Sequence, residues 1–165
     1  MTTKRSFFGC VLGMMGAMLL AGSAVAGSDH ENERHGVEQL PGSWNVQILP
    51  QGASAPLPGL FTFTREGAMI TSESPGPFES SGHGSWVGRG REAAFTFFAL
   101  VGSPAGGGQN TLKFKVIGTL EADAATGGWR GDFVIEVLDP ANNLLATNFG
   151  TLELTRIAVE PLPAH

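Results

Sequence analysis

The segment from Ser81 to Trp86 reads Ser-Gly-His-Gly-Ser-Trp and holds residue types suited to acid–base chemistry. His83 lies between two glycines, which allow close approach of a substrate, and an imidazole titrates near neutral pH. Glu73, Glu79 and Glu92 are the nearest carboxylates in the expected fold, so His83 paired with one of them, Glu73 or Glu92 above all, could act as acid and base. The alternative is a glycine-rich turn into a strand whose Trp86 fills the core. Because side chains alternate along a strand, His83 and Trp86 would then point to opposite faces.

Other short motifs do not support a metal or cofactor site. The run from His30 to His35 places its second histidine one residue too late for the zinc-binding helix motif. The stretch from Gly102 to Gly108 lacks the Lys-Ser/Thr pair of a phosphate-binding loop. Cys10 is the single cysteine, and it lies close to the N-terminus. We therefore expect no metal and no cofactor.

The first 26 residues have the pattern of a secretory signal peptide. Lys4 and Arg5 precede an apolar run from Phe7 to Gly22, and Ala24-Val25-Ala26 forms a small-residue cleavage site. We expect cleavage after Ala26 and export to the periplasm or the cell exterior, by the general or the twin-arginine route. The apolar run is also shorter than the roughly 20 residues that a membrane-spanning helix needs.

The remaining chain is acidic and lightly charged. The 165 residues carry a net charge of −5, which becomes −7 when Lys4 and Arg5 are removed with the signal. An acidic balance disfavours binding to nucleic acid and to acidic membrane surfaces. Residues 27–41 are polar without a strand or helix period, so we expect a flexible lead-in. Residues 42–159 then form one domain, followed by a short tail, residues 160–165.

From residue 42 to residue 159, short alternating segments are separated by clusters of Gly, Pro and Asn, a pattern typical of strands and turns. The pattern predicts an all-β fold, an eight-stranded antiparallel up-and-down β-barrel. Tight turns pair consecutive strands antiparallel, and closure removes two exposed edges. The expected strands are residues 43–49, 59–65, 67–73, 84–89, 92–101, 110–122, 127–138 and 143–158.

Apolar and polar residues alternate along each expected strand, which gives the strand one apolar face and one polar face. In the last expected strand, Leu144, Leu152 and Leu154 share the inner face, opposite Glu153 and other polar residues. A barrel embedded in an outer membrane would present an apolar band with aromatic girdles to lipid, yet the sequence has no Tyr. We therefore expect charges outside, apolar residues inside, and no membrane insertion of the mature chain.

Gly42-Ser43-Trp44 opens the first strand, and Arg156 ends the last strand with the same inward parity as Trp44. If these strands pair, the Arg156 guanidinium lies over the Trp44 indole. This pattern resembles the calycin superfamily of lipocalins, fatty-acid-binding proteins and avidins, in which Gly-x-Trp meets a basic residue of the final strand. The resemblance implies a lipocalin-like barrel that binds or carries a small hydrophobic molecule. The Thr-Asp-Tyr-x-x-Tyr motif of lipocalins is absent.

Inward aromatic residues are the expected ligand surface, although the same side chains could simply fill the barrel. Two further functions stay open. One is an enzyme of the cyclase or isomerase type that uses His83 with Glu73 or Glu92 on a hydrophobic substrate. The other is a protein-binding module, such as a protease inhibitor, that acts through the loops 50–59 and 102–108. The expected ligand contacts are Phe61, Phe63, Phe95, Phe97, Phe114, Trp129, Phe133 and Asn148.

Overall fold

The computed structural model describes residues 36–73, 79–102 and 112–162. The expected signal peptide, the beginning of the expected lead-in and nearly all of the loop 102–108 lie outside these ranges. No helix in the described ranges is long and apolar enough to cross a membrane. The elements are the 3-10 helix η2 (Val37–Gln39) and the strands β1 (Gly42–Pro50), β2 (Leu57–Phe63), β3 (Ala68–Glu73), β4 (Gly82–Arg89), β5 (Glu92–Val101), β6 (Leu112–Asp123), β7 (Gly128–Leu138) and β8 (Leu144–Arg156).

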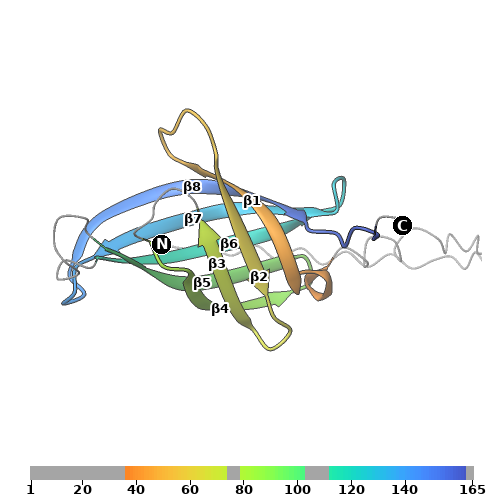
Figure 1. Cartoon of the computed structure of the whole chain (residues 1–165), viewed down its shortest axis with the longest axis horizontal. Coiled ribbons are helices and arrows are strands. Elements are labelled where there is room, and N and C mark those ends of the chain that lie inside the picture. Colours follow the sequence, from red (N-terminus) through yellow and green to blue (C-terminus); the bar gives the residue numbers. More distant parts are fainter. Residues whose placement is uncertain (1–35, 74–78, 103–111, 163–165) are drawn as a thin grey trace, which may run out of the picture.

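The eight strands form one closed antiparallel barrel (Figure 1). Each strand pairs with the next along the chain, and β8 returns to pair with β1. The fold predicted from the sequence is therefore confirmed, and every strand boundary lies within two residues of its expected position. Each strand thus has a partner strand on both sides, although β1 covers only Gly150–Arg156 of β8.

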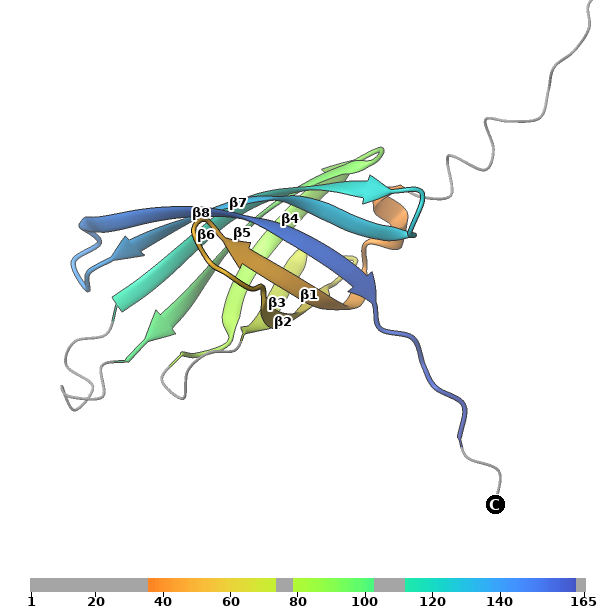
Figure 2. The ribbon, with the colours of Figure 1, turned by 90° about the horizontal axis from the view of Figure 1, so that it is seen from above.

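The two ends of the barrel differ. The floor is the end that holds the β2–β3, β4–β5 and β6–β7 turns, and the rim is the opposite end. At the rim, β5 to β8 project beyond β1 to β3, so one wall of the barrel is longer than the other (Figures 1 and 2). The inner face of the longer wall thus extends past the region that the opposite strands can cover.

Aromatic rings fill the interior between the floor and the middle of the barrel. Phe61 packs edge-on against Phe95 and Phe97, with ring centroids 6.2 and 5.9 Å apart. The Phe95 ring occupies the space that a Cβ on Gly118 would need, because that glycine lies directly opposite it on β6. Glycine here allows a large ring to lie against the neighbouring backbone, so this half of the barrel is packed as a core.

The floor is closed by the chain that precedes β1. Leu40 is completely buried, and its carbonyl accepts a hydrogen bond from Trp44 Nε1 at 2.8 Å. The Arg156 guanidinium lies over the Trp44 ring, 4.8 Å from its centroid, and its Nη1 donates to the Gln39 carbonyl at 2.8 Å. The part of the expected lead-in at residues 36–41 is packed onto the barrel, since Leu40 belongs to the core and Val37 packs against it.

A register shift modifies the rim end of β8. Val137 pairs with Ala146, but the next residue of β7, Leu138, pairs with Leu144. Leu145 is thus an extra residue, and such a bulge interrupts the alternation of faces. The inward assignment holds for Leu152 and Leu154, which are buried, but the expected alternation does not extend across the bulge to Leu144.

We predict that Trp44→Ala lowers the free energy of unfolding by about 3–5 kcal/mol, because Trp44 is 2% exposed and its removal leaves a large void. Arg89→Ala, at an exposed position at the end of β4, is the control and should change stability by less than about 0.5 kcal/mol. Urea unfolding followed by circular dichroism measures both. Equal losses for the two variants would contradict the role assigned to Trp44.

Candidate ligand site at the rim

The inner face of the longer wall stays apolar beyond the packed core. Ala99, Phe114, Val137 and Ala146 form one continuous row across β5, β6, β7 and β8, since each is the register partner of the next. Ala99 is buried, Phe114 and Val137 are half-buried, and Ala146 is exposed. Coverage of this apolar row therefore falls steadily from β5 towards β8.

A second row lies one step closer to the core. Phe97, Val116, Ile135 and Asn148 are successive register partners across the same four strands. Phe97 is 1% exposed, whereas Asn148 at the other end of the row is exposed. The two rows together define what we call the mouth surface: Phe97, Ala99, Phe114, Val116, Ile135, Val137, Ala146 and Asn148.

A polar pair lies on the shorter wall of the barrel, at the rim end of β3. Thr71 is 1% exposed, and Glu73 follows it on the same inner face. The Glu73 side chain lies close to the buried Ile48. Both approach the point that a Cβ at Gly59 would occupy, at 3.5 Å for Glu73 Cγ and 2.9 Å for Ile48 Cδ1, so Glu73 lies on the inner side of the sheet. An added Cβ at Gly82 would meet both the Thr71 hydroxyl and the Phe97 ring. Thr71, the partner of Glu73, thus adjoins the mouth surface at Phe97.

Glu73 is half-buried, and the hollows near it and on the longer wall lie on the outside of the barrel. A hollow of about 620 Å³ on the outer face of β1, β2 and β3 is lined mainly by outward residues such as Asn45, Gln47 and Leu60, and Glu73 lies at its margin. A second hollow of about 600 Å³ lies on the outer face of β5 to β8 and is lined largely by charged residues such as Glu121 and Arg130.

The surroundings of Glu73 favour its protonated form. The pKa of Glu73 is raised to about 7, mainly by burial and also by the negative charge of Glu79, while a hydrogen bond with Thr71 acts in the opposite direction. Burial also raises the pKa of Glu79, which forms an isolated β-bridge with Val101 at the rim. Desolvation disfavours the ionised carboxylate. A positively charged partner would therefore stabilise the ionised form of Glu73.

The aromatic residues expected to contact a ligand divide into two groups. Those nearer the floor are packed against one another with little exposure, so they act as core in this structure. Phe114 and Asn148 lie on the mouth surface, and Phe97 lies at the boundary between core and mouth. The packed residues are Phe61, Phe63, Phe95, Trp129 and Phe133, each 1–3% exposed.

The residues proposed for acid–base chemistry are not brought together. His83 is exposed on the outer face of β4, where it pairs with Ile70 and Phe98. Glu92 is exposed at the floor end of β5, whereas Glu73 faces inward at the rim. The three side chains therefore lie in three different environments. In the described ranges, no group of three or more His, Cys, Asp and Glu residues could hold a metal ion.

Sequence reasoning missed the inward position of Glu73 and the part played by Thr71. The signal was present, because Met69, Thr71 and Glu73 share one parity in β3 and Met69 is a typical core residue. Comparison with known proteins adds nothing to the site, since neither a protein-family model nor a curated protein matches the sequence.

We predict that Glu73→Gln removes a pH-dependent loss of stability. In the unfolded chain the carboxyl ionises near its ordinary pKa of 4.5, but in the folded chain it keeps its proton up to about pH 7. The stability due to this group is therefore fully present below pH 4.5 and is lost as the pH rises to about 7. Between pH 4 and pH 8, the free energy of unfolding of the wild type should therefore fall by about 2–3 kcal/mol more than that of the variant.

Urea unfolding of both proteins at a series of pH values provides this difference. Glu66→Gln, at an exposed position in the β2–β3 turn, is the matched control and should give a difference from wild type that does not change with pH. A pH-independent difference for Glu73→Gln as well would show that the carboxyl is not held in a desolvated environment.

Proposed function

We propose that this protein binds a small hydrophobic molecule on the mouth surface, as a lipocalin-like barrel of the calycin type. The observation that carries the proposal is the apolar inner face that continues beyond the packed core, where Phe114, Ile135 and Val137 are only half-buried. Apolar concave surface rimmed by a few polar groups is the usual character of a ligand site. Asn148 and Glu73 supply such polar groups.

The sealed floor supports the same proposal. Aromatic packing, Leu40 and the Trp44–Arg156 contact occupy the floor half, so a ligand would enter from the rim. Gly42-Ser43-Trp44 with Arg156 is also the arrangement that suggested the calycin resemblance. Export through the signal peptide of residues 1–26 is part of the proposal and rests on the sequence pattern.

A pair of matched substitutions tests the location of the site. Val137 faces the mouth, and Val134 of the same strand has the opposite parity and pairs with Ile117 and Phe149 on the outer face. Both valines are half-buried. We predict that Val137→Trp weakens binding of the neutral fluorescent probe N-phenyl-1-naphthylamine at least about tenfold, because the indole fills the site, whereas Val134→Trp changes it less than about threefold.

Probe fluorescence titration measures the affinities, and thermal melts followed by circular dichroism establish that both variants fold. Native mass spectrometry of the protein from its producing cell provides an independent test through a co-purified small molecule. Equal weakening by both substitutions, or a wild type that does not bind the probe, would contradict a ligand site at the mouth.

A further inference from the structure

Given ligand binding at the mouth, we propose that the ligand is a hydrophobic amine, and that Glu73 is the specificity-determining residue that pairs with its ammonium group. The apolar body of such a molecule would lie on the mouth surface. Its charged nitrogen would lie beside the Glu73 carboxylate and the Thr71 hydroxyl, and this hydroxyl adjoins the mouth surface at Phe97. The inference rests on the proposed function and specifies the chemistry of its ligand.

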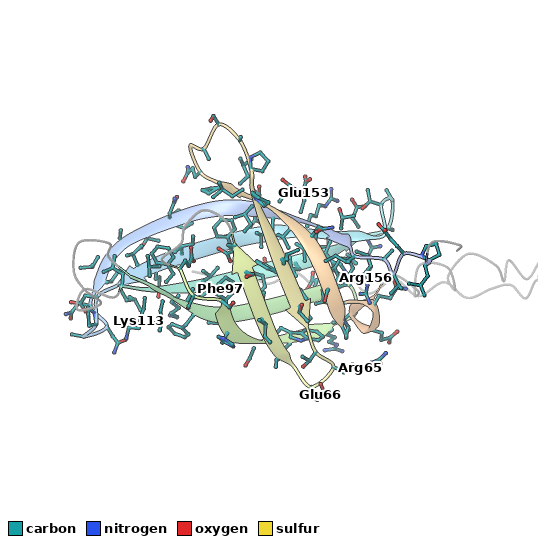
Figure 3. The ribbon with its side chains drawn as sticks, viewed as in Figure 1. Arg65, Glu66, Phe97, Lys113, Glu153 and Arg156 are labelled. Atoms are coloured by element: carbon teal, nitrogen blue, oxygen red, sulfur yellow. The ribbon has the colours of Figure 1, made fainter. Side chains whose placement is uncertain are left out.

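The charges at the rim are unbalanced on the inside of the barrel. Glu73 faces inward, and the charge of Glu79 acts on it, but no cation among the described residues contributes a lowering of its pKa. The basic residues of the longer wall near the rim lie on the outer parity of β6. Lys113 (labelled in Figure 3) donates to Asn142 there, and Lys115 forms a 2.9 Å ion pair with Glu136.

The cations at the floor are too far along the barrel to help: Arg91 donates to the Ala122 carbonyl there. Arg156 lies at the floor, where Trp44 and the Gln39 carbonyl hold its guanidinium. Figure 3 places Arg156 at the end of the barrel opposite Lys113. The described interior therefore offers a ligand near the rim a negative group without a protein counter-ion.

Desolvation makes this arrangement selective for the charge of the ligand. An ammonium group beside a partly buried carboxylate relieves the cost of its ionisation, and charge-assisted hydrogen bonds of this kind are stronger than neutral ones. A ligand carboxylate would instead add a further negative charge near Glu73 and Glu79. The neighbouring Phe97 ring is compatible with a nearby ammonium, since aromatic faces attract cations. The raised pKa of Glu73 is the expected property of such a carboxyl before its partner binds.

An organic cation fits the site better than a metal ion. The described residues contain no group of three or more potential metal-binding side chains, the apolar Ile48 lies near Glu73, and the Phe97 ring lies near its partner Thr71. Divalent metal ions require several oxygen or nitrogen ligands, whereas an alkylammonium needs a few hydrogen-bond acceptors and an apolar surface for its chain. The composition of the site therefore indicates an amine with an apolar body.

Three probes with the same twelve-carbon chain test the inference. Dodecylammonium, dodecanol and dodecanoate differ in their head groups, and each displaces N-phenyl-1-naphthylamine from the full mature chain at about pH 8, below its micelle concentration. At this pH, above the pKa of about 7, Glu73 is mostly ionised. We predict that dodecylammonium binds at least about tenfold more tightly than dodecanol, and dodecanoate more weakly than either.

The substitution Glu73→Gln tests whether this side chain causes the preference for dodecylammonium over dodecanol. It should reduce dodecylammonium affinity at least about tenfold and leave dodecanol within about threefold of wild type, because the amide keeps the shape but loses the charge. Glu66→Gln removes the same charge from the exposed β2–β3 turn near the floor and should leave all three affinities unchanged (Figure 3).

The outcomes separate this inference from the proposed function. If dodecanol binds and dodecylammonium is no tighter, or if Glu73→Gln keeps the full preference, the assignment of Glu73 as the amine partner is overturned while the hydrophobic site stands. If Glu66→Gln reduces the preference as much as Glu73→Gln, the effect is one of net charge, and the assignment also fails. If none of the three probes displaces the dye, both the hydrophobic site and the amine preference are overturned.

Discussion

The pairing of β1 with β8 is the constraint on which the rest of the structure depends. Seven consecutive residue pairs, from Trp44 with Arg156 to Pro50 with Gly150, convert an open meander into a barrel. Without this pairing the sheet would have two long edges and no enclosed interior. The Trp44–Arg156 contact lies at the end of this seam and also holds the preceding chain, through Leu40 and Gln39. Closure and sealing of the floor are thus achieved by the same few side chains.

Closure creates an interior, and the packing divides it into two halves. Near the floor, aromatic rings lie against glycines of neighbouring strands, as Phe95 does on Gly118 and Phe133 on Gly150, so the space is filled. Towards the rim, β5 to β8 continue without strands opposite them, and their inward side chains lose cover. A small barrel can therefore be stable and still present an apolar surface, because different residues supply the core and the mouth.

Glu73 marks the boundary between these halves. A carboxyl that faces inward beside Thr71 and Ile48 costs stability above pH 7, and a filled core would have no use for it. Groups that lower stability without a structural benefit are characteristic of functional sites. The mouth surface and Glu73 together thus give one explanation for two features that core packing alone leaves unexplained: exposed apolar residues on an inner face, and an inward acid without a counter-ion among the described residues.

The sequence by itself determined the all-β class, the eight strands, the inward and outward faces and the contact of Trp44 with Arg156. Each of these follows from period two and from short turns, which are local. The tertiary structure decided where along the barrel each inward residue lies. One row of register partners runs through Trp129, Leu154, Val46, Gly59 and Glu73, from the floor to the rim. Because tilted strands are staggered on closure, parity assigns a face but not a height, so the sequence could not separate core phenylalanines from mouth residues.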